Sequence, residues 1–520
     1  MKKQSLTVLL LFGLLLCLLA SCGTQKENGK GATIREFVPQ EPYTEEDLPA
    51  IQLTKTVYHR SESIELTCRN TDDGDLIRIY REGETRGSAD PIHEKVVCEG
   101  TLSFNTGLMT PGVYSVYLLD DDGLYVHDTA EVRIYNQEDQ ANYGPTAAKI
   151  YLNGEDRICV DIQPETGLET MVEYRIYWAK AGNLLEDYTV AHICTHRGSE
   201  PFTVMLNEGA YMPQEADGVI IMAMAGGENM LFITAPEEMG LQESKLLYRY
   251  NILSDLHVSP SWPRCNAMVK KAFQDIIAQG YSSVIFTLGD NTERGQENEY
   301  ELLKSIVTGA GEKLPNIYYA MGNHDIVYNN NAGYDKQLAL FQKYTGMPGA
   351  YYAVELNGHF HIILGSDTLS HLGTIGQEQQ DWLKAQLEKT DPQSPIFIYL
   401  HQPLKDTTSG TLYTKYNKSQ DQDSFGILDD TKALREILKN YPNAILLTGH
   451  THRSFLSEQP VLLGGGKDAN FVACSTVGKA DGGSEGIYVE VYEDYVLIRG
   501  RDFANEQWCG CMQIKIPLNK

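Results

Sequence analysis

Residues 284–291 read Val-Ile-Phe-Thr-Leu-Gly-Asp-Asn, a short apolar run that ends in a glycine and a carboxylate. A continuous apolar run of this length is typical of a strand buried on both faces, as in the parallel sheets of α/β folds. Stretches with helical periodicity flank it at 265–279 and 300–307. Such strands present functional side chains at the carboxyl edge of the sheet. The segment therefore predicts an α/β domain with a polar site at that edge.

Four more apolar runs end in the same way. They are Asn-Ile-Leu-Ser-Asp-Leu-His at 251–257, Ile-Tyr-Tyr-Ala-Met-Gly-Asn-His-Asp at 317–325, Pro-Ile-Phe-Ile-Tyr-Leu-His at 395–401 and Ala-Ile-Leu-Leu-Thr-Gly-His-Thr-His at 444–452. A glycine in three of the five turns lets the backbone reverse tightly over the sheet edge. Each motif alone is more often a capped turn. Five in order, rich in histidine and carboxylate, indicate a metal centre.

The order Asp-x-His, Gly-Asp, Gly-Asn-His-Asp, His and Gly-His-x-His resembles that of the calcineurin-like metallophosphoesterases. The resemblance covers about half the chain, from roughly Tyr248 to the end. It implies a four-layer αββα sandwich over residues 245–520 that hydrolyses phosphate esters by a metal-bridging hydroxide. The alternating tail at 486–500 is expected to form a hairpin that completes the second sheet.

The resemblance also implies a role for each motif residue. Metal ligands would be Asp255, His257, Asp290 and His452 for the first ion, and Asp290, Asn323, His401 and His450 for the second. Such ligands suit manganese, iron or zinc, so two divalent or trivalent ions are expected without a choice of element. His324 is the expected general acid, with Asp325 orienting its ring. A turn cap is the alternative role for Asp325.

Some motif residues differ from those of particular branches of this family, and these differences limit the expected substrate class. Purple acid phosphatases carry a tyrosine where this sequence has Glu293, and they lack a histidine corresponding to His257. Residues 290–295 resemble the protein serine/threonine phosphatase motif, in which the arginine (here Arg294) contacts phosphate, but Met321 replaces that branch's second arginine. The third motif ends in Asp325 rather than in a glutamate, and in this it resembles the motif of the class III cyclic-nucleotide and glycerophosphodiester phosphodiesterases.

We therefore expect a phosphodiesterase or a phosphoesterase that accepts a broad range of esters. The alternative within the enzymes is a phosphomonoesterase acting on nucleotides or sugar phosphates. Arg294 is either a phosphate ligand or a residue of a surface ion pair. A non-catalytic surface-binding lipoprotein with a relict metal site is the alternative from another class. The complete ligand set weighs against it, because a decayed site should have lost at least one ligand.

The N-terminus is typical of an exported bacterial lipoprotein. Three residues, Met-Lys-Lys, precede an apolar run at 6–20, which fits a signal peptide rather than a spanning helix of ~20 residues. The run ends Leu-Ala-Ser-Cys-Gly, which looks like a lipobox, so residues 1–21 are the expected signal and Cys22 the lipidated residue. Residues 22–49 are expected to be a flexible tether. These features predict an extracytoplasmic protein, lipid-anchored at the bacterial cell envelope.

Two segments between the tether and the α/β domain contain short alternating runs without a helical stretch. Residues 50–137 and 145–238 each contain several such runs, which predicts two all-β sandwiches. Both resemble immunoglobulin or fibronectin type III domains at the level of pattern. Spacers that hold the third domain off the membrane are the expected role, with glycan binding as the alternative.

Composition limits the partners. The 520 residues are 42% hydrophobic and 22% charged, as in ordinary globular proteins, and the formal net charge is −27. Such an acidic chain repels phosphate backbones, so no nucleic-acid-binding surface is expected, and a phosphate-ester substrate would need local positive charge such as a bound metal. Eight cysteines follow Cys22, and disulfides or buried thiols are equal alternatives for Cys68, Cys98, Cys159 and Cys194. The oligomeric state is not predicted.

Overall fold

The computed structural model describes residues 48–519, except 85–88, 99, 122, 124–125, 136–143, 167–170, 225–227, 281, 330–331, 413–427, 429–430, 458 and 479–483. The expected signal peptide, Cys22 and nearly all of the expected tether lie outside the described residues. The described residues belong to one compact unit. None of their helices is long and apolar enough to cross a membrane.

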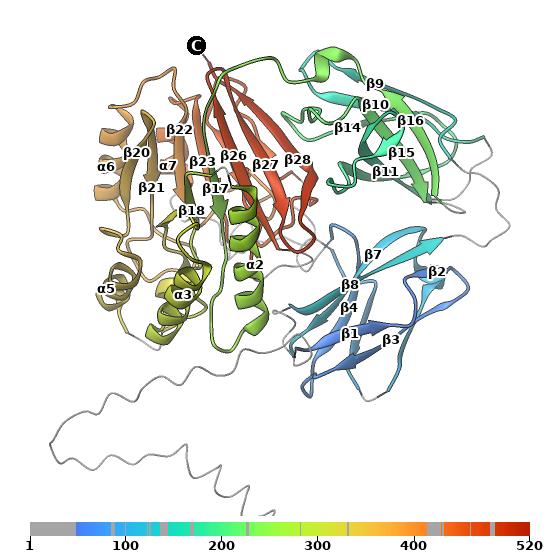
Figure 1. Cartoon of the computed structure of the whole chain (residues 1–520), viewed down its shortest axis with the longest axis horizontal. Helices are drawn as coiled ribbons and strands as arrows, with labels where there is room; N and C mark the ends of the chain where they lie inside the picture. The colour runs from blue at the N-terminus through green and yellow to red at the C-terminus, as the bar shows by residue number, and fades with distance from the viewer. Residues whose placement is uncertain are drawn as a thin grey trace, which may run out of the picture. The chain divides into compact units, whose positions relative to one another are not determined.

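Two six-stranded sheets form the centre of the C-terminal half, with strand orders β19-β18-β17-β26-β27-β28 and β20-β21-β22-β23-β25-β24 (Figure 1). The first sheet consists of β17 (Leu246–Leu253), β18 (Val284–Thr287), β19 (Asn316–Tyr319), β26 (Glu485–Tyr492), β27 (Tyr495–Asp502) and β28 (Gln507–Pro517). The second consists of β20 (Tyr352–Leu356), β21 (His359–Ile363), β22 (Ile396–Leu400), β23 (Ala444–Thr448), β24 (Val461–Leu462) and β25 (Asn470–Ala473).

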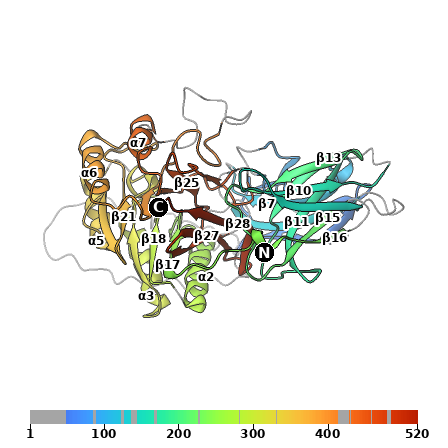
Figure 2. The same ribbon diagram turned by 90° about the horizontal axis from the view of Figure 1, so that it is seen from above.

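Alternation along the strands separates three layers of apolar side chains. Phe286 of the first sheet and Tyr399 of the second lie in the core between the sheets. Ile285 packs instead with the helices on the outer face of the first sheet, and Ile398 with those on the outer face of the second. These helices are α2 (Pro263–Gln279), α3 (Glu297–Ala310) and α5 (Tyr334–Thr345) on one side, and α6 (Gln377–Leu387) and α7 (Thr431–Leu438) on the other (Figure 2). The predicted four-layer αββα sandwich is confirmed.

The C-terminal hairpin joins a different sheet from the expected one. β26 pairs antiparallel with β17, and β27 and β28 continue outward from it. The prediction that this hairpin completes the second sheet is therefore wrong. Alternating residues predict the hairpin, but both sheets face the same core, so the pattern does not distinguish between their edges.

Two β-sandwiches precede this domain, as the sequence predicted. The first pairs a sheet β1-β3-β6 with a sheet β2-β8-β7-β4-β5, and the second pairs β14-β10-β9 with β12-β11-β15-β16, where β13 also pairs with β11. The strands of the first are β1 (Ala50–Leu53), β2 (Val57–His59), β3 (Ser63–Arg69), β4 (Leu76–Arg81), β5 (His93–Val96), β6 (Leu102–Asn105), β7 (Gly112–Leu119) and β8 (Val126–Tyr135). Those of the second are β9 (Ala147–Leu152), β10 (Ile158–Gln163), β11 (Met171–Lys180), β12 (Asn183–Leu184), β13 (His192–Arg197), β14 (Phe202–Met205), β15 (Gly218–Met224) and β16 (Glu228–Thr234).

The second sandwich packs against the outer edge of β28. The backbone N–H of Thr189 donates to the carbonyl of Trp508 at 2.8 Å, and that of Tyr211 donates to the carbonyl of Gln513 at 3.1 Å. The indole Nε1 of Trp178 donates to the carbonyl of Gly510 at 2.9 Å. This sandwich is therefore more than a spacer, because it covers a strand edge that would otherwise present unpaired backbone groups.

The eight cysteines of the described residues all carry free thiols. Five of them are buried, namely Cys159, Cys265, Cys474, Cys509 and Cys511. Burial raises the pKa of the Cys194 thiol to about 12, which keeps it protonated at neutral pH.

Candidate metal centre

The five motifs meet where strands of the two sheets end. β17, β18 and β19 of the first sheet lead into Asp255, Asp290 and Asn323. β22 and β23 of the second sheet lead into His401 and His450. Side chains from segments almost 200 residues apart thereby converge on one place, as expected at the carboxyl edge of α/β sheets.

Five of the seven expected ligands have a left-handed backbone conformation. The φ angles are 53° for Asp255, 47° for His257, 50° for Asp290, 70° for His450 and 53° for His452. This conformation costs a non-glycine residue about 1–2 kcal/mol, and such strain collects at functional sites. The surrounding turns therefore hold these side chains over the sheet edges at an energetic cost.

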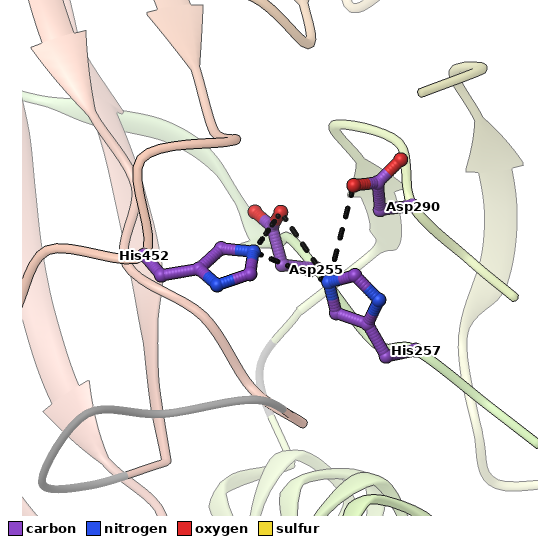
Figure 3. Close-up of side chains that lie close together, drawn as sticks. All are labelled: Asp255, His257, Asp290 and His452. Atoms are coloured by element: carbon purple, nitrogen blue, oxygen red, sulfur yellow. Dashed lines mark hydrogen bonds and ion pairs between the residues drawn. The ribbon is translucent and has the colours of Figure 1, made fainter. Parts of the chain in front are cut away.

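Asp255, His257, Asp290 and His452 form the first cluster, with one ligand atom of each within 4.8 Å of the others (Figure 3). The Nε2 atom of His452 lies 2.9 Å from Oδ1 of Asp255 and 3.2 Å from Nε2 of His257. Nε2 of His257 lies 3.8 Å from Oδ1 of Asp255 and 3.9 Å from Oδ2 of Asp290.

Asp290, His401 and His450 form the second cluster within the same limit. The Nε2 atom of His401 lies 3.1 Å from Oδ2 of Asp290 and 3.0 Å from Nδ1 of His450. It also lies 3.1 Å from Oδ1 of Asn323, which brings the seventh expected ligand to this cluster. Asp290 is common to both clusters, as a bridging carboxylate must be.

Hydrogen bonds to Nδ1 of two histidine rings determine which ring nitrogen faces the clusters. Nδ1 of His257 lies 2.7 Å from a carboxylate oxygen of Glu293, and Nδ1 of His401 lies 3.0 Å from the carbonyl oxygen of Leu288. Both oxygens are acceptors, so each Nδ1 carries a proton and each ring presents its Nε2 atom to the cluster.

These Nε2 atoms lie among oxygen atoms that offer lone pairs. One of them, Oδ2 of Asp290, is buried and makes no hydrogen bond, although it lies 3.1 Å from Nε2 of His401. Burying such an array is unfavourable unless a cation lies among the donors. The donor set therefore fits two divalent or trivalent ions.

The pKa values of the cluster indicate the same need for positive charge. Burial opposes the charged form of His401, but the Asp290 carboxylate raises its pKa to about 9. Burial and the charge of His401 together lower the pKa of His450 to about 3. Without metal, a proton on His401 would substitute for the missing cation, and metal binding would release it.

His324 lies beside the first cluster. Its ring centroid is 4.6 Å from that of His257, and its Nδ1 atom lies 2.6 Å from the carbonyl oxygen of Glu293. Its backbone N–H donates to Oδ1 of Asp290 at 2.8 Å. The side chain is 16% exposed, so it borders both the expected metal ligands and the solvent.

The expected pairing of Asp325 with the His324 ring is wrong. The buried Asp325 carboxylate accepts hydrogen bonds from six groups: the backbone and side chains of Asn291 and Thr292, the backbone of Gly322 and the hydroxyl of Tyr300. Burial and the nearby Asp290 raise its pKa to about 6. Asp325 therefore joins the second and third motif turns, which is the turn-cap alternative.

Glu293 is the site residue whose role the sequence reasoning missed. Its carboxylate contacts Nδ1 of His257, and its backbone carbonyl contacts Nδ1 of His324. The available signal was its position three residues after Asp290, in a turn that returns to the cluster. Arg294, the next residue, has an exposed side chain, and its backbone N–H donates to Glu299 at 2.8 Å.

Comparison with known proteins identifies the family of the domain that contains this site. Residues 248–454 match the family model described as calcineurin-like phosphoesterase, a span that contains all five motifs. The chain therefore contains a calcineurin-like metallophosphoesterase domain, of a family of metal-dependent hydrolases.

A curated relative from Rhodococcus erythropolis (strain PR4 / NBRC 100887) bears the name "Probable cyclic nucleotide phosphodiesterase". It is 28% identical over 211 residues, which cover 39% of this chain and 64% of the relative. Among solved structures, the purple acid phosphatase PPD1 from yellow lupin is 12% identical, with a TM-score of 0.39 over 91% of this chain and 96% of that chain. A predicted phosphoesterase from Streptococcus pneumoniae TIGR4 is 14% identical, with a TM-score of 0.26 over 52% of this chain and 97% of that chain.

Proposed function

We propose that this protein hydrolyses phosphate diesters at the two joined clusters. The observation that carries the proposal is the convergence of imidazole nitrogen and carboxylate oxygen atoms beside His324, one of which, Oδ2 of Asp290, is buried without a hydrogen bond. Asp255, His257, Asp290 and His452 would hold one ion, and Asp290, Asn323, His401 and His450 the other. The name of the Rhodococcus relative and the terminal Asp325 of the third motif support diesters over monoesters.

Two bound ions would polarise a phosphoryl oxygen and lower the pKa of a water molecule that attacks phosphorus. The residues of the chain supply the remaining functions. Glu293 fixes the His257 and His324 rings through their Nδ1 atoms. His324 would transfer a proton from Nε2 to the leaving oxygen, which makes it the general acid. Asp325 would hold the turns that carry Asp290 and Asn323 in their relative positions.

Turnover of two model esters tests the proposal. Bis-(p-nitrophenyl) phosphate and p-nitrophenyl phosphate would be given to the chain from Gly23 onward, metal-stripped and with added manganese, iron or zinc. We expect metal-dependent hydrolysis, faster for the diester, that the Asp290→Ala variant loses. Faster monoester hydrolysis would favour the phosphomonoesterase. No turnover by a protein shown to bind two ions would favour the binding lipoprotein.

We also propose that the protein is exported and anchored to the bacterial cell envelope by lipid on Cys22. The lipobox-like Leu19-Ala-Ser-Cys-Gly23 after a signal-like run supports this. In a bacterial host, the full chain should fractionate with membranes and be extracted by detergent. The Cys22→Ser variant should lose the lipid. If the mature N-terminal peptide of the unaltered chain has the mass expected without lipid, the proposal is contradicted.

A further inference from the structure

Two aromatic rings extend from His324 toward solvent. The ring centroid of Tyr328 lies 4.3 Å from that of His324, with 33° between the planes. The ring of His371 meets Tyr328 edge-on at 4.9 Å and 70°. Tyr328 is 39% exposed, and His371 is exposed as well. A row of rings therefore runs outward from the proposed general acid.

Neighbouring contacts hold both rings close to the metal centre. Tyr328 follows the short helix α4 (Asn323–Ile326), and the side chain of Asn329 donates to the carbonyl of Gly295 at 3.0 Å and to Gln337 at 2.8 Å. The carbonyl of His371 accepts a hydrogen bond at 3.3 Å from the side chain of Gln402, the residue after His401. These contacts hold the Tyr328 ring near the segment of Asn323 and the His371 ring near the segment of His401, and both segments contain an expected ligand.

The direction of proton transfer determines what these rings can contact. If His324 protonates the leaving oxygen, the leaving group must lie on the His324 side of the phosphorus. Tyr328 packs against His324, so a bulky leaving group that extends past His324 would reach the Tyr328 ring. Aromatic side chains bind nucleobases by stacking, with little dependence on which base is present.

We infer that Tyr328 and His371 form a stacking platform for a planar ring in the leaving group, which selects nucleoside-bearing phosphate esters. This inference rests on the proposed function. The platform recognises the ring without using positive charge, which suits a chain with a net charge of −27.

A matched pair of substrates tests the platform. Adenosine 2′,3′-cyclic phosphate and glycerol 1,2-cyclic phosphate carry the same five-membered cyclic diester, but only the first has a base. We expect Tyr328→Leu, in the full metal-loaded chain, to lower the ratio of the two kcat/KM values about tenfold. Tyr328→Phe should keep the ratio, because it keeps the ring. Leu369→Ala, a 45% exposed side chain near His371, is the control and should leave the ratio unchanged.

Equal losses on both substrates would overturn the inference, because Tyr328 would then only position His324. No preference for the adenosine ester in the unaltered protein would overturn it as well. A protein that turns over neither these esters nor bis-(p-nitrophenyl) phosphate would contradict the proposed function instead. In that case, a comparison of the equilibrium affinities for adenosine monophosphate and glycerol phosphate tests the stacking platform separately. Tighter adenosine monophosphate binding that Tyr328→Leu abolishes supports it, and equal binding overturns it.

Discussion

Glu293 joins the expected metal ligand His257 to the proposed acid His324 through two different groups of one residue. The carboxylate contacts His257 at 2.7 Å and the backbone carbonyl contacts His324 at 2.6 Å. A carboxylate behind a ligating imidazole fixes its tautomer and raises its basicity. Glu293 is also largely buried, at 7% exposure, so its charge acts at short range and with little screening.

The Glu293→Gln variant should therefore bind metal about 10–100 times more weakly while remaining folded. Removing the negative charge makes the His257 Nε2 atom a poorer ligand. Competition with a chelator, together with the bound-metal stoichiometry, measures the affinity. Glu297→Gln is the matched control, because Glu297 is an exposed partner of Lys343 at 2.6 Å. Equal affinities in both variants would show that Glu293 has no influence on the site.

His324 and Asp325 are adjacent, but their variants should fail in different ways. His324→Ala should keep its metals and its stability and lose about 10²–10⁴ in kcat, the usual contribution of a general acid. Asp325→Ala should lower the free energy of unfolding by more than about 3 kcal/mol, because it leaves several buried donors unpaired at about 1–3 kcal/mol each. Urea unfolding and steady-state kinetics measure the two effects. A stable, inactive Asp325→Ala protein would restore the ring-orienting role.

The seven expected ligands converge as the sequence predicted, whereas the residues around them were assigned less well. Strand-end motifs predict ligands because the sheet edge itself brings strand ends together. Asp325 was linked to His324 through the family resemblance. Its side chain points to Asn291 and Thr292 because α4 turns it away from its neighbour. Such directions depend on backbone angles in the turns, which residue spacing does not encode.

At the scale of elements, the turn after each strand matters as much as the strand. Gly449 directly follows β23 and precedes His450. A Cβ atom there would collide with the hydroxyl of Ser254 and lie 2.8 Å from Oδ2 of Asp255. The turns of the two sheets therefore touch at a glycine, and a side chain at this position would displace an expected metal ligand.

Gly449→Ala should accordingly lose metal and activity together. Gly309→Ala is the control, because a Cβ atom at Gly309 in α3 meets nothing within 4 Å. This second change should raise the free energy of unfolding by about 0.5–1 kcal/mol through helix propensity, with activity unchanged. Metal analysis and unfolding curves of the two variants provide the comparison. Full metal content in Gly449→Ala would contradict the close contact between the turns.

Glu485, the first residue of β26, should make stability depend on pH. Burial raises its pKa from the usual 4.5 to about 7, although Ser454 and the Phe455 N–H both donate to its carboxylate at 3.1 Å. The folded state therefore binds the proton more tightly. The resulting stabilisation is complete below about pH 4.5 and is lost as the pH rises through about 7.

We expect the Glu485→Gln variant to reduce this pH dependence. Between pH 5.5 and 8, the parent chain should lose about 2 kcal/mol through this group, since one pKa unit is worth about 1.4 kcal/mol and the side chain is partly exposed. Urea unfolding at the two pH values measures the loss. An equal slope in Glu485→Gln would assign the pH dependence to other groups.

At the scale of the whole molecule, the candidate metal centre connects both sheets. Its expected ligands extend from Asp255 to His452, so bound ions would cross-link most of the catalytic domain. Periodicity and strand spacing, which are local properties, predicted an α/β domain and the two sandwiches before it, and the family resemblance implied the four layers of that domain. The sequence did not predict the contact between the second sandwich and β28, which depends on surfaces far apart in the chain.

Removal of metal should therefore destabilise the domain. Ions present at a hundred times their dissociation constant contribute about 2.7 kcal/mol each, and their removal should lower the melting temperature by several degrees. Thermal unfolding with and without a chelator measures the shift. The Asp290→Ala variant should show a smaller shift, and an equal one would place the responsible ions elsewhere.

The cover over β28 has a consequence for any attempt to isolate the catalytic domain. A chain beginning at Leu246 would keep every expected ligand but would expose the edge of β28, a strand of 11 mostly buried residues. Open edges of this length template aggregation, as in domain swapping and amyloid. The second sandwich thus protects this strand edge from pairing with other chains. Expression of the catalytic domain without it should therefore yield oligomers and inclusion bodies rather than a smaller soluble enzyme.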